Sequence, residues 1–237
     1  LIENPATKVI DTSTERRVSD HWVYGLPEIS AEHRQAIRTA DRVANCGCYP
    51  LSFILAVRPL IEAGLLDAAA PLTINAVSGY SGGGRKMVEA YEAVAKEGAA
   101  RIPLCLYSLQ TQHKHVPEIW KFSLAETAPM FIPSVDHAFC GMVVSTPIPA
   151  AYFSGAGARP QDVHAIWCAY YKDAPLLRLV DPDDTAVVLR DGAFLDLDAL
   201  SYGNFIELSV WGDEHGLVLI GRLDNLGKGA SGNAVQC

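Results

Sequence analysis

The sequence lacks the features of membrane and secreted proteins. No apolar run reaches the roughly 18 residues that a membrane-spanning helix needs. The first residues, Leu1-Ile2-Glu3-Asn4-Pro5, show neither the charged nor the apolar region of a signal peptide. The six cysteines are scattered through 237 residues, a length that does not depend on disulfides for stability. We therefore expect reduced thiols, a cytoplasmic location and no membrane partner.

Basic residues are also scarce. Lysine and arginine together number 19, against 27 aspartate and glutamate residues, which gives a formal net charge of −8 and a pI near 5.3. This balance argues against a nucleic-acid partner, although a local basic pocket for a small anion is compatible with it. Because 49% of the residues are hydrophobic, the chain can bury the core of one large domain, or of one domain with a smaller attachment.

The stretch Asn45-Cys46-Gly47-Cys48-Tyr49-Pro50 carries the clearest chemical pattern. Cys48 stands just before Pro50, and apolar residues then recur at helical spacing, so the thiol is expected where a helix begins. The partial positive charge at a helix N-terminus lowers a thiol pKa toward neutrality, and its free N–H groups can hold an oxyanion. Taken alone, Cys48 is equally compatible with the commoner role of a cysteine, that of a small buried hydrophobe.

A second pattern is a glycine-dense turn. A strand is predicted over 72–77, and it leads into Ser78-Gly79-Tyr80-Ser81-Gly82-Gly83-Gly84 and then into a helix that begins near Arg85. Backbone N–H groups in such a turn can approach an anion without obstruction by side chains. The turn matches neither G-x-G-x-x-G nor a Walker loop. It is either an anion site with Arg85 beside it or only a tight turn.

A third pattern combines two histidines with a carboxylate. His113 and His115 precede Pro117 and Glu118, which begin another predicted helix. Histidine titrates near neutrality and a carboxylate can fix its tautomer, so the cluster suits proton transfer. Because His115 lies within one helical turn of Glu118, we expect His115 to transfer the proton and His113 to face the substrate.

The other elements follow from periodicity and turn residues. A short strand is expected over 7–11, Ser30 caps a helix that runs to about Ala40, and residues 22–28 form an aromatic turn. The helix that starts at Cys48 contains Pro59, which predicts a kink or two short helices. Further strands are predicted over 130–133, 140–148 and 176–180, a helix over 160–172, a hairpin over 205–223, and a glycine-rich end over 224–234 that either packs closely or forms a flexible tail.

Six motifs in this order resemble the N-acetyl-gamma-glutamyl-phosphate reductases of arginine biosynthesis, especially their shorter class. They are Asp11-Thr12-Ser13 with Arg17, Tyr24-Gly25, Asn45 to Pro50, Ser78 to Gly84, His113 to Ile119 and Leu223 to Gly232. The resemblance covers essentially the whole chain. Cys46 stands where many members of the family have proline, which places a second thiol close to the nucleophile.

The resemblance implies an α/β fold related to aspartate-semialdehyde and glyceraldehyde-phosphate dehydrogenases. Residues 1–44 would be a remnant of a Rossmann-type NADP domain, residues 45–223 an α+β catalytic and dimerisation domain, and residues 224–237 a segment that returns to the nucleotide domain. No glycine-rich fingerprint precedes Asp11, so we expect the first half of the dinucleotide-binding domain to be missing.

The resemblance also implies an activity: reduction of N-acetyl-glutamyl 5-phosphate by NADPH to the 5-semialdehyde and phosphate, through a thioester on Cys48 with His115 as general acid/base. The implied substrate-binding residues are His113, Glu118, Tyr107, Arg85, Ser81, Asn45 and Arg17. The implied NADP(H)-binding residues are Ser13, Ser78, Gly79, Asn225 and Gly229. The implied partners are a small-molecule acyl phosphate and further copies of the chain, as a homo-oligomer, without a metal.

Two other classes of function remain open. Cys46, Cys48, His113 and His115 are the residue types that bind zinc, so a structural zinc module is one alternative, although such close spacing within each pair strains a tetrahedral site. The other alternative is a cofactor-free pseudoenzyme that keeps only the dimer-forming domain.

Overall fold

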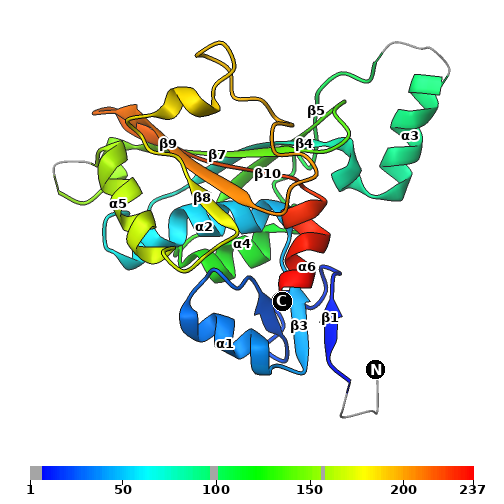
Figure 1. The fold of residues 1–237 in the computed structure, drawn as a ribbon, viewed down its shortest axis with the longest axis horizontal. Coiled ribbons are helices and arrows are strands. Elements are labelled where there is room, and N and C mark those ends of the chain that lie inside the picture. The colour runs from blue at the N-terminus through cyan, green and yellow to red at the C-terminus, as the bar shows by residue number, and fades with distance from the viewer. Residues whose placement is uncertain (1–6, 97–100, 156–157) are drawn as a thin grey trace.

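A computed structural model describes residues 7–96, 101–155 and 158–237. Two β-sheets organise this part of the chain, a large mixed sheet and a small parallel one, with helices packed between and beside them (Figure 1). The protein is therefore of the α/β class, as the sequence predicts.

The large sheet has seven strands in the order β5-β6-β4-β7-β10-β9-β8. Their bounds are β4 Thr73–Gly79, β5 Cys105–Leu106, β6 Met130–Asp136, β7 Met142–Pro149, β8 Leu177–Leu179, β9 Ile206–Asp213 and β10 Gly216–Leu223. The small sheet has the order β1-β3-β2, with β1 Val9–Asp11, β2 Val23–Gly25 and β3 Arg42–Asn45. The helices are α1 Ala31–Thr39, α2 Cys48–Glu62, α3 Arg85–Lys96, α4 Val116–Ser123, α5 Pro160–Tyr170 and α6 Gly232–Gln236.

The elements predicted from long patterns are confirmed, whereas the short strands β2, β3 and β5 were missed. Residues 22–28 were assigned to a turn, but Val23–Gly25 form β2, and β3 was not predicted. Both strands are parallel partners, with Tyr24 opposite Ala44. Three or four residues are too few to show an alternating pattern, so pairing with the neighbouring strand decides their conformation.

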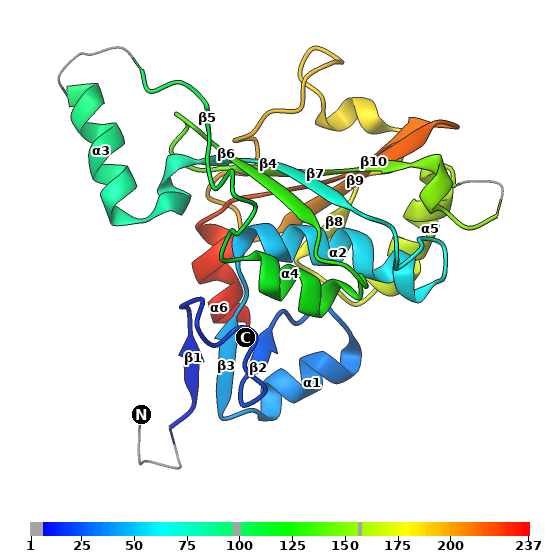
Figure 2. The same ribbon diagram turned by 180° about the vertical axis from the view of Figure 1, so that it is seen from behind.

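Helix α2 is the central helix of the fold. Side chains from Tyr49 to Leu60 are buried on nearly all of its sides, which is typical of a helix enclosed by other elements. It packs on β10 and is flanked by α4 and α5 (Figure 2). At Gly221 of β10 the approach is so close that an added Cβ would clash with Ser52 Oγ of α2. This packing fixes the position of Cys48, the first residue of the helix.

Pro59 does not divide α2 into two helices, because the helix runs continuously from Cys48 to Glu62. A proline inside a helix leaves the carbonyl four residues earlier without its amide donor. That carbonyl belongs to Leu55, and it accepts a hydrogen bond of 2.6 Å from the Tyr171 hydroxyl, next to the end of α5. The expected break is absent because a side chain from another part of the chain replaces the missing donor.

The glycine-rich end of the chain is packed and is not a flexible tail. Gly227–Ser231 form a π-helical turn, which is followed by α6. The Asn233 amide of α6 donates to the Gly25 carbonyl and to Asn45 Oδ1, both at 2.7 Å. Figures 1 and 2 show α6 beside β3, so that the C-terminal segment joins the small sheet to the large one.

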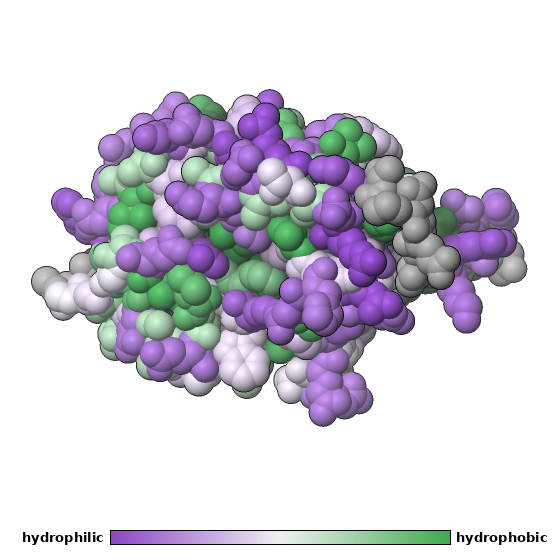
Figure 3. All heavy atoms as spheres, turned by 90° about the horizontal axis from the view of Figure 1, so that it is seen from below, coloured by the Kyte–Doolittle hydropathy of each residue, from purple (hydrophilic) through white to green (hydrophobic). Residues whose placement is uncertain are grey.

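No helix in the described part of the chain is long and apolar enough to cross a membrane. The end of the molecule that carries α1 and the small sheet shows hydrophilic residues spread over its surface, with smaller hydrophobic patches between them (Figure 3).

Candidate active site

Cys48 borders a cavity of about 430 Å³ that collects residues from distant parts of the sequence. All the site residues predicted from the sequence line this cavity except Glu118, Arg85 and Ser13. Those that line it are Arg17, Asn45, Cys48, Ser78, Gly79, Ser81, Tyr107, His113, His115, Asn225 and Gly229. The fold therefore brings the cysteine, glycine-turn and histidine patterns to one place.

The three exceptions differ in their surroundings. Glu118 is buried directly behind the cavity, where it contacts Arg17. The Ser13 backbone N–H donates to Asp11 Oδ1 at 2.6 Å, just after β1. The Arg85 side chain is 90% exposed and pairs with Glu89 at 2.7 Å, one turn along α3. The geometry thus gives no support to the prediction that Arg85 binds the substrate.

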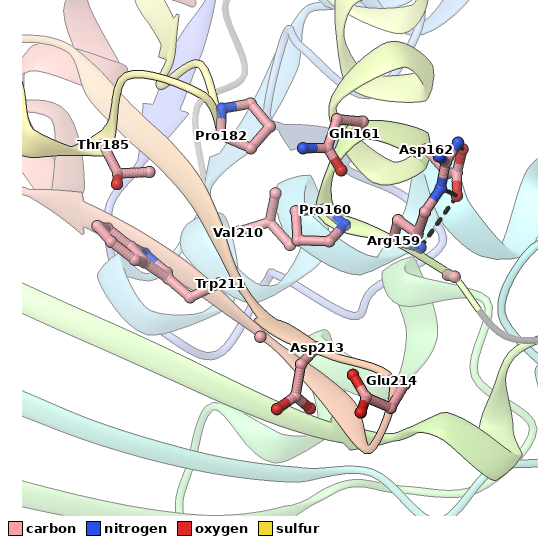
Figure 4. Close-up of a pocket in the computed structure, with 12 residues that line it drawn as sticks. Arg159, Pro160, Gln161, Asp162, Pro182, Thr185, Val210, Trp211, Asp213 and Glu214 are labelled. Atoms are coloured by element: carbon pink, nitrogen blue, oxygen red, sulfur yellow. Dashed lines mark hydrogen bonds and ion pairs between the residues drawn. The ribbon is translucent and has the colours of Figure 1, made fainter.

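A larger cavity, of about 730 Å³, lies at the β9–β10 hairpin and the start of α5 (Figure 4). Trp211 and Asp213 stand on its strand side, and the Arg159–Asp162 pair stands at the helix. Among the described residues that line it there is no cysteine and no histidine. Size alone would select this cavity, but the chemical groups select the one at Cys48.

Glu118 holds the start of α2 in place. Its Oε1 accepts from Arg17 Nη1 at 2.7 Å, and its Oε2 accepts from the Tyr24 hydroxyl at 2.8 Å and from the Gly47 N–H at 3.1 Å. Burial raises the pKa of Glu118, while the Arg17 charge and the donors from Gly47 and Tyr24 oppose that rise. This carboxylate therefore joins α4, the small sheet and the residue that precedes Cys48.

Gly47 lies against three side chains of the site, those of Arg17, Glu118 and His115. A Cβ at this position would lie 2.7 Å from Arg17 Nη1, 2.8 Å from Glu118 Oε1 and 3.0 Å from His115 Nε2. Its φ of −80° is open to any residue, so close approach and not backbone conformation requires glycine here. The Gly47-Cys48 pair in the sequence thus has a steric cause that only the folded site shows.

The sequence analysis expected the N-terminus of α2 to lower the pKa of the Cys48 thiol, but the pKa is raised instead. Burial raises its pKa to about 11, and the opposing effects of the Tyr49 N–H and the Arg17 charge are smaller. The expectation of a pKa near neutrality is therefore wrong for this structure, because removal from water disfavours a thiolate more than the helix start favours it. Near neutral pH the group is a thiol and needs a base.

Two imidazoles, those of His113 and His115, line the same cavity as the Cys48 thiol. The rings of His113 and His115 are 4.7 Å apart, and the Tyr49 ring lies 5.9 Å from the first and 5.8 Å from the second. Burial, and then the positive charge of Lys114, lower the pKa of His113 to about 4. Burial also lowers the pKa of His115 well below its usual value. A neutral imidazole can accept the proton of a thiol.

The hydrogen bonds also identify one tautomer and leave one expectation without support. The backbone N–H of His115 donates to the ring atom Nδ1 of His113 at 3.2 Å. Since Nδ1 accepts, the proton of the neutral His113 ring is on Nε2. His115 Nε2 lies 3.9 Å from Glu118 Oε1, beyond hydrogen-bond distance, so no hydrogen bond supports the prediction that Glu118 orients His115. Among the described residues, the buried His115 Nδ1 has no hydrogen-bond partner, which leaves a ring nitrogen free for a reacting proton.

The raised pKa of Cys48 makes a testable prediction about pH. A group with a pKa of about 11 gains thiolate as the pH rises toward that value, so the rate of alkylation by iodoacetamide should increase about tenfold per pH unit from about pH 7 to pH 10. The rate is measured on the Cys48 peptide by mass spectrometry. A plateau below about pH 8 would instead show a stabilised thiolate and contradict the burial argument.

One wall of the cavity is formed by closely packed glycines and a fixed amide. A Cβ on Gly229 would lie 2.8 Å from Cys48 Cβ, and a Cβ on Gly82 would lie 3.0 Å from Ser78 Oγ. The Asn225 amide is held in place, since its Oδ1 accepts from the Gly141 N–H at 2.9 Å and its Nδ2 donates to Ser81 Oγ at 2.8 Å. Glycine at these two positions therefore lets the backbone of this wall lie directly against Cys48 and Ser78, because a side chain there would collide with them.

The structure gives no support to the zinc module. The described residues contain no group of three or more histidine, cysteine, aspartate or glutamate side chains that could hold a metal ion. The Cys46 sulfur is fully buried and accepts a hydrogen bond from Asn233 Nδ2 at 3.4 Å. Burial raises its pKa well above the usual value, so this second thiol is a buried part of the cavity lining.

Sequence reasoning missed several residues that line the cavity, and Tyr49 and Lys114 are the two among them with polar side chains beside the histidines. The Tyr49 hydroxyl is 3.0 Å from the Tyr107 hydroxyl, and its ring touches both histidines. Lys114 stands between His113 and His115 in the sequence. Direct adjacency to predicted site residues was the signal that could have identified both.

Comparisons with known proteins show which family the chain resembles. A family model described as the semialdehyde dehydrogenase dimerisation domain matches residues 48–225. The chain is 43% identical over 238 residues to N-acetyl-gamma-glutamyl-phosphate reductase of Burkholderia lata, with coverage of 100% of this chain and 73% of that protein. It is 39% identical over 241 residues to N-acetyl-gamma-glutamyl-phosphate reductase 2 of Nostoc sp., with coverage of 100% and 74%.

Solved structures show the same fold at lower identity. Aspartate semialdehyde dehydrogenase II from Vibrio cholerae matches with a TM-score of 0.68 and 17% identity, over 96% of this chain and 70% of that one. The aspartate semialdehyde dehydrogenase from Francisella tularensis matches with a TM-score of 0.65 and 11% identity, over 96% and 72%. At these identities the likeness establishes the fold.

Proposed function

The chain belongs to the N-acetyl-gamma-glutamyl-phosphate reductases, oxidoreductases of arginine biosynthesis, and we propose that it reduces N-acetyl-glutamyl 5-phosphate to N-acetyl-glutamate 5-semialdehyde and phosphate through a thioester on Cys48. One observation carries this proposal: a single cavity is lined by Cys48 at the start of α2 and by His115 at the start of α4. A cofactor-free module would have no use for this pairing.

The first chemical step forms the thioester. Neutral His115 takes the proton of the Cys48 thiol, and the sulfur attacks the acyl carbonyl carbon of the substrate. The bond between that carbon and the phosphate oxygen breaks, and His115 gives the proton to the leaving phosphate. Thiol and acyl phosphate thus become thioester and hydrogen phosphate, while free N–H groups at the start of α2 stabilise the oxyanion that forms on the way.

NADPH, when bound, supplies the hydride that reduces the thioester to the aldehyde. The residues that would hold its nicotinamide form the wall beside Cys48, namely Ser78, Gly79, Gly82, Asn225 and Gly229. Ser13 follows β1 at the carboxyl edge of the small parallel sheet, which is the edge at which such sheets bind ligands. In this wall Gly229 packs directly against Cys48.

The domain organisation is part of the proposal. Residues 1–44 would belong to the nucleotide-binding domain, which the parallel order β1-β3-β2 supports. Residues 45–223 would form the catalytic and dimerisation domain, and residues 224–237 would return to the first domain, as the contact of Asn233 with Gly25 supports. The match to a dimerisation domain supports a homo-oligomer.

Mass spectrometry of the intact protein tests the function. With N-acetyl-glutamyl phosphate and no NADPH, the chain should gain the mass of one N-acetyl-glutamyl group and release one equivalent of phosphate, because the thioester has no hydride donor. Hydroxylamine should remove the added mass, as it does for a thioester. A protein that gains no mass and releases no phosphate would exclude the proposed reaction.

A further inference from the structure

The proposed substrate is anionic, so the cavity that binds it must provide positive charge. An acyl phosphate of an N-acetylated dicarboxylic acid is negative at its phosphate and at its free carboxylate, so the site needs a cationic side chain that is free to pair with it. The cavity has Arg17 and Lys114 as its lysine and arginine side chains. The two side chains differ in whether their positive charge is already paired with a carboxylate of the protein.

Arg17 is already occupied by the protein. Its Nη1 donates to Glu118 Oε1 at 2.7 Å, its Nε to the Asn45 carbonyl at 2.9 Å, and its Nη2 to the Thr12 carbonyl at 3.3 Å. The Arg17 side chain is 9% exposed and that of Glu118 is 2% exposed. An anion that bound Arg17 would have to compete with a buried carboxylate, so the positive charge of Arg17 is largely neutralised.

Lys114 has the opposite surroundings. Its side chain is exposed at the border of the cavity, between the two buried histidines and before the start of α4. Its ammonium group forms neither an ion pair nor a hydrogen bond with the rest of the described chain. Its charge reaches the site, because it is one cause of the lowered pKa of both His113 and His115.

We infer that Lys114 binds an anionic group of the substrate, its phosphate or its carboxylate, and that it is the cation by which the site selects acyl phosphates of this class. The inference rests on the proposed function. A bound anion would also offset the Lys114 charge and make His115 a stronger base when substrate is present.

The rate of Cys48 acylation, measured by intact mass without NADPH, tests the inference with two substrates. Lys114→Met should lower the second-order acylation rate with N-acetyl-glutamyl phosphate about tenfold, since a charge-assisted contact is lost. Acetyl phosphate has the phosphate but lacks the carboxylate, so it shows which of these two anionic groups Lys114 binds. If both substrates slow, Lys114 binds the phosphate. If only N-acetyl-glutamyl phosphate slows, it binds the carboxylate. Either result supports the inference.

Three controls exclude indirect effects. Lys114→Arg should retain the rate within a few-fold because it keeps the charge, and Lys172→Met should leave it unchanged because this exposed lysine does not line the cavity. Iodoacetamide is neutral and should alkylate Cys48 at the same rate in wild type and Lys114→Met. An equal loss with iodoacetamide, or no loss with either substrate, overturns the inference. A wild-type chain that neither substrate acylates overturns the proposed function, and the inference falls with it.

Discussion

Replacing Cys48 with serine is expected to abolish acyl-enzyme formation, with a loss of at least about a thousandfold in rate. The sulfur stands at the first position of α2, in the cavity that His115 also lines. A serine hydroxyl at this partly buried position is a far weaker acid than a thiol, and neutral His115 cannot generate enough alkoxide for attack. The measurement is the intact mass after incubation with N-acetyl-glutamyl phosphate.

Cys46→Ser is the matched control, because it removes a thiol two residues away. The Cys46 sulfur accepts from Asn233 Nδ2 at 3.4 Å, and a serine oxygen can accept the same hydrogen bond. We expect Cys46→Ser to keep acylation within about tenfold of wild type. Equal loss in both variants, or an acyl group found on the Cys46 peptide, would contradict the assignment of Cys48 as the nucleophile.

Lys228→Met is expected to lower the free energy of unfolding by about 3–5 kcal/mol. Lys228 and Glu28 are both fully buried, and Lys228 Nζ donates to Glu28 Oε1 at 2.7 Å and to Asn233 Oδ1 at 3.0 Å. Without the ammonium, the Glu28 carboxylate remains buried with the Gln236 amide, at 2.9 Å, as its donor. Urea unfolding followed by circular dichroism measures the change.

The double variant Glu28→Gln with Lys228→Met provides the control. It removes both charges, so it should recover a large part of the lost stability if the cost arises from an unpaired buried carboxylate. Lys172→Met, which removes an exposed lysine, should change the stability by less than about 0.5 kcal/mol. A Lys228→Met protein within about 1 kcal/mol of wild type would show that the pair does not hold the C-terminal segment.

The Lys228 pair also has a consequence for the site. Lys228 lies in the π-helical turn Gly227–Ser231, and the next residues, Gly229 and Ala230, line the cavity beside Cys48. A chain weakened at Lys228 should therefore have a less well defined cavity wall beside Cys48, although neither Lys228 nor Glu28 lines the cavity.

Sequence patterns predicted the parts of this protein that depend on neighbours within a few residues. The start of α2 at Cys48, the Ser30 cap of α1, the glycine turn after β4 and the histidines before α4 were all placed correctly. Each follows from helical periodicity, proline position or turn chemistry, which act over about one helical turn. The order of the six motifs was sufficient to identify the family.

The tertiary structure alone decided how these parts act. The Arg17–Glu118 contact joins residues 101 positions apart, and the Lys228–Glu28 contact joins residues 200 positions apart. The continuity of α2 through Pro59 depends on the Tyr171 hydroxyl, and the raised pKa of Cys48 depends on burial by segments distant from it. Local sequence fixes which groups are present, whereas burial and long-range pairing set their charge and their partners, because both depend on segments that meet only in the folded chain.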